Sequence, residues 1–190
     1  MKYLEMQRKL KLNLFTLLDV QKLFPEESDH AIKVQLSRFG QKGLMTQIKR
    51  GLYCFDQSQV DEFELANKLY QPSYISMETA LNYYGLIPDI TQSLTSVTLT
   101  TTKKIENQFG TFHYVKISRE LFFGFQKVRS AKSQSYFNIA VKEKSLLDYL
   151  YIRRLKSVKE LRLNTSPINF TIFRNYAQHF PAWVRKIKLT

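Results

Sequence analysis

The chain has 190 residues, of which 44% are hydrophobic and 14% aromatic, so it can bury the core of one compact domain or of two small ones. It holds no run of about 18 apolar residues that could span a bilayer, its first residues mix charged with apolar side chains unlike a signal peptide, and its single cysteine excludes an internal disulfide. We therefore predict a cytoplasmic protein with no membrane contact, and the net charge of +13 indicates a polyanionic partner.

Residues 1–57 are predicted to form three short helices and a hairpin. Apolar spacing indicates helices in the segments 3–12, 16–24 and 28–42. Thr16 and Ser28 are suited to cap the second and third helices, and Gly43 to end the third. Two short strands follow, joined by a turn in which Gly51 supplies a positive φ. Three helices followed by a two-stranded wing are the plan of a winged helix-turn-helix.

Residues 58–190 are predicted to form a mixed α/β domain with a small antiparallel sheet, so the chain as a whole is expected to be α+β. The segment 56–72 is acidic and helix-prone, and it blurs the boundary between the two domains. Alternating apolar and polar residues indicate strands in the segments 94–102, 111–117, 121–128 and 135–141, with a turn at 107–110. Helical spacing indicates helices in the segments 76–84, 141–154 and 168–180.

The third helix carries most of the residues that we predict to bind DNA. Its apolar stripe, Ile32, Leu36 and Phe39, leaves the opposite face to polar side chains that can reach base edges in the major groove. Basic residues beside that face and at the tip of the hairpin can hold phosphates. The predicted DNA-binding residues are His30, Lys33, Ser37, Arg38, Gln41, Lys42, Lys49 and Arg50. The alternative is the ordinary solvated face of an amphipathic helix.

The positive charge is concentrated in the C-terminal part of the chain. Residues 1–58 carry a net charge of +4, residues 59–102 carry −4, and residues 103–190 carry +13. Such a surface can hold phosphates regardless of base sequence, and the candidates for these additional contacts are Lys103, Lys104, Arg153 and Arg154. A basic surface that is merely solvated is the alternative.

Catalytic signatures are absent from the sequence. It contains no G-x-S-x-G elbow, phosphate-binding glycine loop, dinucleotide-binding glycine pattern or H-E-x-x-H, and its three histidines are scattered. Asp148 is expected to form an ion pair with a lysine neighbour, Lys142 or Lys144. Cys54 is expected to be a small buried hydrophobe rather than a reactive thiol. We predict neither catalytic activity nor a bound metal or cofactor.

Four segments together resemble the AbiEi antitoxins, which are found beside nucleotidyltransferase-like toxins in bacterial abortive-infection operons. They are GLMTQIKRGLYCF (43–55), SYISMETALNYYGLIPD (73–89), VTLTTTKKIENQFGTFHYVKI (97–117) and IAVKEKSLLDYLYIRR (139–154). None of them is a catalytic signature, but their order and spacing carry the resemblance across most of the chain.

The resemblance implies a type IV antitoxin with two activities. Its winged helix-turn-helix would bind inverted repeats in the operon promoter and repress it, with one monomer per repeat and cooperative occupation of the pair. Its C-terminal domain would counteract the toxin without forming a stable complex. The DNA contacts that the family makes from its recognition helix and wing fall here on Lys33, Ser37, Arg38, Gln41, Lys49 and Arg50.

Two alternatives stay open at this point. The protein could be an antidote that binds RNA or the toxin itself, with an acidic surface on the partner complementing the basic C-terminal half. It could instead be a nucleic-acid enzyme, which would need clustered carboxylates for metal ions, and the sequence does not show them.

Overall fold

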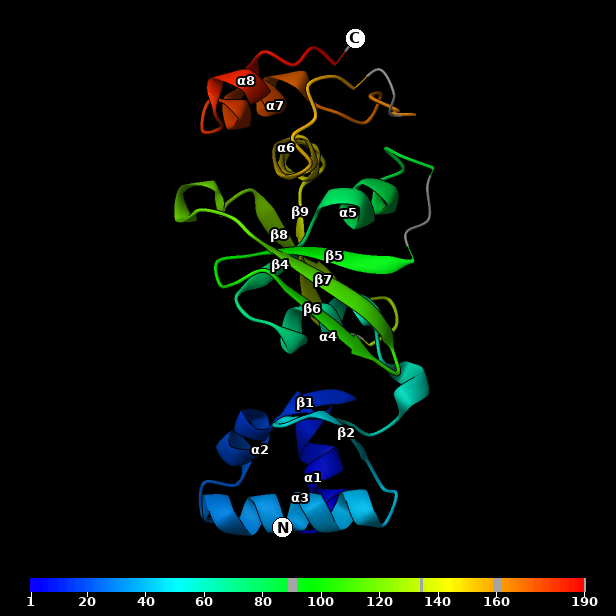
Figure 1. The fold of residues 1–190 in the computed structure, drawn as a ribbon. Helices are drawn as coiled ribbons and strands as arrows, with labels where there is room; N and C mark the ends of the chain where they lie inside the picture. Colours follow the sequence, from blue (N-terminus) through cyan, green and yellow to red (C-terminus); the bar gives the residue numbers. More distant parts are fainter. Residues whose placement is uncertain (89–91, 134, 159–161, 190) are drawn as a thin grey trace. The chain divides into compact units, whose positions relative to one another are not determined.

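The computed structural model describes residues 1–88, 92–133, 135–158 and 162–189, and it is a mixed α+β fold (Figure 1). The chain divides into two compact units. The first comprises Met1–Leu69 and Arg129–Tyr136, and the second comprises Tyr70–Val128 and Phe137–Thr190. The division after Leu69 falls inside the predicted connector, 56–72. Each unit is described by itself below.

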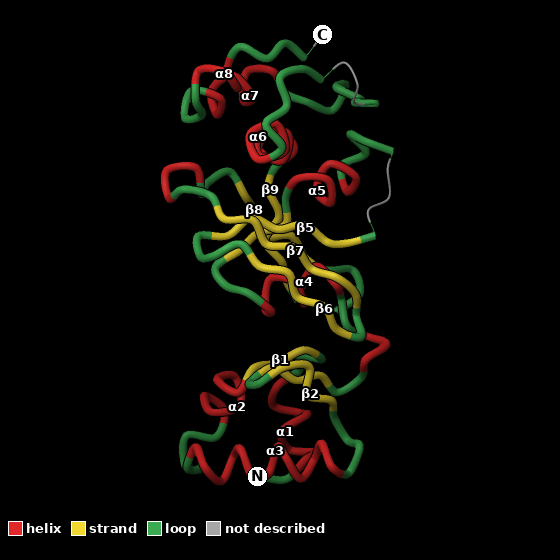
Figure 2. The backbone as a smooth tube through the Cα atoms, viewed as in Figure 1, coloured by secondary structure: helices red, strands yellow, loops and turns green. Residues whose placement is uncertain are grey.

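The first unit combines short helices with a three-stranded antiparallel sheet. Figure 2 shows α1, α2 and α3 gathered on one side of the short strands. The strand order is β1-β3-β2. The elements are α1 (Tyr3–Leu10), β1 (Leu14–Thr16), α2 (Leu17–Leu23), α3 (Asp29–Gln41), β2 (Thr46–Lys49), β3 (Leu52–Cys54), the 3-10 helix η1 (Gln57–Gln59) and α4 (Glu62–Leu69).

Local capping explains where α2 and α3 begin and end. Thr16 accepts the backbone N–H of Asp19, and the Asp19 carboxylate accepts the backbone N–H of Thr16 in return, which completes a capping box. Ser28 caps α3 through the N–H of Ala31. Gly43 follows α3 at a φ of +68° and closes it with a Schellman motif. The two predicted N-caps and the terminal glycine are confirmed.

Strand β1 was not predicted from the sequence. It consists of three residues and pairs antiparallel with β3, with Leu14 opposite Cys54 and Thr16 opposite Leu52. A run of three residues is too short to show an alternating pattern. Strand β1 forms because it can pair with the edge of β3, and that edge lies far from it in the sequence.

The core of the first unit lies between the helices and this sheet. It includes the predicted α3 stripe and is made of Met6, Leu10, Phe15, Val20, Phe24, Ile32, Leu36, Phe39, Met45 and Tyr53. Cys54 is fully buried in β3, and this burial, with a smaller effect from the charge of Asp56, raises the pKa of its thiol to about 11. The thiol therefore stays protonated at neutral pH, as expected of a buried hydrophobe rather than a nucleophile.

The acidic connector is folded. One carboxylate oxygen of Asp61 accepts the backbone N–H groups of Phe63 and Glu64 at 2.9 Å each, which caps the start of α4. The other oxygen accepts the Ser130 hydroxyl at 2.6 Å. This bond ties Ser130 to the first unit although 69 positions separate it from Asp61 in the sequence.

The second unit is built on a six-stranded sheet in the order β6-β7-β5-β4-β9-β8. Figure 1 shows α6 between this sheet and the pair α7 and α8. The elements are β4 (Ser73–Ile75), α5 (Met77–Tyr83), β5 (Ser93–Thr98), β6 (Lys103–Asn107), β7 (Gly110–Lys116), the 3-10 helix η2 (Arg119–Leu121), β8 (Phe125–Arg129), β9 (Tyr136–Ala140), α6 (Lys142–Ile152), α7 (Phe170–Ala177) and α8 (Ala182–Arg185).

The prediction of a small antiparallel sheet is wrong for this unit, because the sheet is mixed. Strand β5 is parallel to β7, and β4 is parallel to β9, whereas the pairs β4–β5 and β6–β7 are antiparallel. The expected turn at 107–110 does exist, but it joins β7 to β6, a strand that the alternation pattern did not reveal. Strand β7 therefore lies beside β5 and runs in the same direction.

A buried ion pair lies between α6 and the sheet, as expected for Asp148. Lys144 contacts Asp148 one turn later on α6, and both side chains are inaccessible to solvent. Lys144 also donates to the Tyr74 hydroxyl at 2.9 Å, while Tyr74 and Ser76 donate to the second oxygen of Asp148 at 3.0 and 2.8 Å. Burial lowers the pKa of Lys144 and raises the pKa of Asp148, and their mutual attraction opposes both shifts.

Gly124 packs directly on this ion pair. It has a φ of +70°, and a Cβ added to it would lie 3.0 Å from Cγ of Lys144. The ammonium group of Lys144 also lies 5.2 Å from the centre of the Phe123 ring. The lysine is thus enclosed by aromatic and backbone atoms, and Asp148 is the only carboxylate that contacts it among the residues described in the structure.

Candidate functional site

The exposed face of α3 carries the polar residues that the sequence placed there. Ile32, Leu36 and Phe39 are buried against the core. The remaining candidates on or just after the helix are exposed, namely His30, Lys33, Ser37, Arg38, Gln41 and Lys42. Burying the apolar stripe fixes the rotation of the helix, so the other side is available to a ligand.

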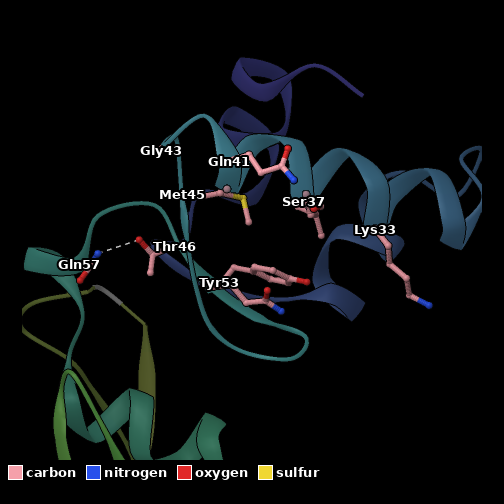
Figure 3. Close-up of a pocket in the computed structure, with 11 residues that line it drawn as sticks. Lys33, Ser37, Gln41, Gly43, Met45, Thr46, Tyr53 and Gln57 are labelled. Carbon is pink, nitrogen blue, oxygen red and sulfur yellow. Dashed lines mark hydrogen bonds between the residues drawn. The ribbon is translucent and has the colours of Figure 1, made fainter.

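A groove of about 800 Å³ runs between this face of α3 and the hairpin β2–β3. Figure 3 shows Lys33, Ser37 and Gln41 spaced along α3, with Tyr53 of the hairpin across from Ser37. Leu36, Met45 and Tyr53 give the groove an apolar floor. The structure thus brings together Lys33, Ser37 and Gln41 in one concave surface.

The other predicted helix residues do not line the groove. His30, Arg38 and Lys42 are exposed on α3 and just after it, but none contributes to the groove wall. Positions 33, 37 and 41 are four residues apart and therefore follow one another along one side of the helix, whereas positions 38 and 42 turn away from that side.

Several groove residues were missed by the sequence analysis. Thr46 and Gln47 lie on β2. Gln57 lies in η1 and donates to the Thr46 hydroxyl at 3.0 Å. Gln47 lies directly opposite Tyr53 in the ladder, so the two side chains project to the same side of the hairpin. Alternation along β2 could have placed Gln47 beside Tyr53 only once the register of the two strands was known.

The two basic residues of the hairpin have different environments. The turn between β2 and β3 consists of Arg50 and Gly51, and Gly51 has the expected positive φ, +80°. Arg50 is exposed at this turn. The Lys49 ammonium instead donates to the backbone oxygen of Leu69 at 2.5 Å, at the C-terminal end of α4, where a cation is favoured by the helix dipole. Arg50 is therefore the better placed of the two to meet a phosphate.

The four candidates in the C-terminal part do not form one site. Arg153 is bound to Glu78, with its Nε 2.8 Å and one of its terminal nitrogens 2.6 Å from the carboxylate. Lys104 is paired with Glu106, and the Lys103 ammonium lies 5.4 Å from the centre of the Tyr70 ring. Arg154 lines a separate cavity in the second unit.

We expect Gly40→Ala to stabilise the first unit by about 0.5–1 kcal/mol, because glycine in a helix interior lowers stability by that amount relative to alanine. Gly40 lies within α3, and a Cβ added to it meets no atom within 4 Å. Urea unfolding followed by circular dichroism measures the change. Gly43→Ala is the matched control, since its Cβ would also find open space but its φ of +68° strains an alanine. Destabilisation by both variants would contradict the expectation for Gly40.

The groove offers hydrogen-bond donors and acceptors, one lysine and an apolar floor. These groups can form hydrogen bonds and apolar contacts with a polar surface. Within the described ranges, no three His, Cys, Asp or Glu side chains lie close enough to hold a metal ion. No helix among the same residues has both the length and the apolar character needed to cross a membrane.

The first unit is thus an α+β arrangement in which an exposed polar helix lies beside a tight hairpin. Neither a scan of the sequence against protein-family models nor a search of curated proteins gave a match.

Proposed function

We propose that the first unit contains a winged helix-turn-helix, residues 1–57, that binds duplex DNA. The observation that carries this proposal is the groove between the exposed face of α3 and the hairpin β2–β3. The element order α1-β1-α2-α3-β2-β3 supports it, because α3 then corresponds to the recognition helix and the β2–β3 turn to the tip of the wing.

The dimensions and chemistry of α3 suit the major groove. The helix has 13 residues, which corresponds to a length of about 20 Å, and an α-helix fits the major groove of B-DNA. Gln41 can make two hydrogen bonds to an adenine edge, and Ser37 can bond to several bases. Lys33 at the helix flank and Arg50 at the wing are suited to phosphates, which position a protein on DNA without reading its sequence.

We propose further that the protein is an antitoxin and the autorepressor of its own operon. The resemblance of four segments to the AbiEi antitoxins supports this role. One monomer would occupy each inverted repeat of the promoter, with cooperativity between the two, and the protein would oppose a nucleotidyltransferase-like toxin without a stable complex. The net charge of +13 in residues 103–190 would add affinity that does not depend on base sequence.

A binding titration of the purified protein tests the proposal. It compares the upstream promoter of the protein with a scrambled duplex of the same composition, each at two salt concentrations. We expect binding to the promoter to be tighter by about tenfold or more near physiological salt, as for an operator-specific protein. Equal and equally salt-sensitive binding to both duplexes would overturn sequence-specific repression.

A further inference from the structure

A second cavity, of about 710 Å³, lies in the second unit and is lined by residues from the end of α6, from α8 and from the end of β7. This unit is separate from the one that holds the α3 groove. The cavity walls combine cations with aromatic rings, and the residues that define its chemistry are Lys116, Arg154, Lys156, Lys186, Tyr151 and Trp183.

Among the residues that the structure describes, the cations of this cavity have no acidic counterparts. The described residues of the lining include no aspartate or glutamate, and no described carboxylate forms an ion pair with any of the four basic side chains. All four are exposed. Four like charges around one cavity repel one another, so an anion with several charges would be attracted to it.

The aromatic part of the cavity is fixed in place. The Trp183 ring is 38% exposed, and its inner side packs on Tyr151 with ring centres 6.1 Å apart and planes 21° from parallel. Tyr151 is held in turn by Phe180, edge to face, at 5.7 Å. A partly exposed indole on such a support is a surface on which a planar ring can stack.

The backbone at Arg154 places this residue directly at the end of α6. Arg154 follows α6 at a φ of +54°, in the left-handed region that glycine usually occupies after a helix. The N–H of Leu155 donates to the backbone oxygen of Leu150 at 3.0 Å, so this conformation closes α6, and it leaves the Arg154 side chain in the cavity lining.

We propose that this cavity binds a nucleotide, with the base stacked on Trp183 and the phosphates held by Arg154, Lys156, Lys186 and Lys116. A free phosphate would leave the aromatic wall unused, and an apolar ligand would leave four cations unpaired. The nucleotide comes either from the free nucleoside triphosphate pool or from a single-stranded nucleic acid. This inference goes beyond the proposed binding of duplex DNA by α3 and involves the other unit.

Trp183 makes the test direct, because it is the single tryptophan of the chain and its fluorescence reports on this cavity. The full-length protein is titrated with ATP, with tripolyphosphate, with an oligoadenylate and with a short duplex. We expect saturable quenching by ATP, by the oligoadenylate or by both, and the tighter of the two identifies the source of the nucleotide. Binding of tripolyphosphate as tight as that of ATP, or no saturable quenching by either nucleotide ligand, would overturn the proposal.

Two variants distinguish nucleotide binding in the cavity from nonspecific binding to the basic surface. Changing Arg154→Ala and Lys186→Ala together is expected to weaken nucleotide binding by about tenfold or more, because two phosphate contacts are lost. Arg185→Ala is the matched control, since Arg185 shares α8 with Trp183 but does not line the cavity. Its effect is expected to stay within about twofold. Equal losses in the two variants, or an equally strong signal from duplex DNA, would show a nonspecific polyanion surface and overturn the proposal.

Discussion

Lys144→Met is expected to lower the free energy of unfolding of the second unit by about 3–5 kcal/mol, the usual effect of breaking a buried ion pair by removing one partner. The variant leaves the Asp148 carboxylate fully buried with no cation beside it. The hydroxyls of Tyr74 and Ser76 still donate to that carboxylate, but they cannot neutralise its charge. Urea unfolding monitored by Trp183 fluorescence measures the change, because Trp183 lies in the same unit.

Two further variants control this experiment. The double change of Lys144→Met and Asp148→Leu leaves no unpaired charge, and we expect it to recover a large part of the lost stability. Recovery should be incomplete, because the hydroxyls of Tyr74 and Ser76 lose their acceptor. Lys127→Met, at an exposed position on β8, is expected to change stability by less than about 0.5 kcal/mol. A Lys144→Met variant as stable as Lys127→Met would contradict the structural importance of the pair.

Gln41→Ala is expected to weaken binding to the promoter by about 1–3 kcal/mol, or about fivefold to 150-fold, and to leave binding to scrambled DNA nearly unchanged. The reason is that Gln41 faces the groove from α3 and can make a bidentate contact with one base. Parallel titrations on the two duplexes measure the difference. Gln35→Ala is the matched control, because Gln35 lies on the same helix but does not line the groove.

The wing gives the complementary result within the same experiment. Arg50→Ala is expected to weaken binding to all DNA alike. It should also reduce the slope of the logarithm of the binding constant against the logarithm of the salt concentration by about one, as loss of a phosphate contact does. Lys49→Ala should have the smaller effect on DNA, since Lys49 is engaged with the end of α4. Equal losses from Gln41→Ala and Gln35→Ala, or a Gln41 effect of the same size on every sequence, would contradict base reading by α3.

Much of the secondary structure could be predicted from the sequence because its signals are local. Thr16 and Ser28 cap their helices through N–H groups three residues away, and Gly43 and Gly51 supply positive φ where a helix ends and a hairpin turns. The ion pair of Lys144 and Asp148 joins positions four residues apart on one helix. Such features depend on a few neighbouring residues, so the sequence alone indicates them.

The candidate site could be predicted only in part. Helical phase places Lys33, Ser37 and Gln41 on the exposed side of α3, and the structure places them in one groove. Phase alone could not separate them from Arg38 and His30, which are equally polar and equally exposed. Which of these polar residues line the groove depends on where the hairpin β2–β3 lies beside α3.

The sequence by itself therefore determined where α2 and α3 start, where α3 ends, and which face of α3 is turned to solvent, whereas it did not indicate α8. Only the tertiary structure decided that β7 runs parallel to β5, that Lys49 is bound at the end of α4, and that Arg153 is paired with Glu78. Arg153 and Glu78 are 75 residues apart, and their charges are indistinguishable in the sequence from those of free surface residues. Capping and periodicity are set by a few adjacent residues, whereas strand partners and ion-pair partners are set by where the chain returns in space.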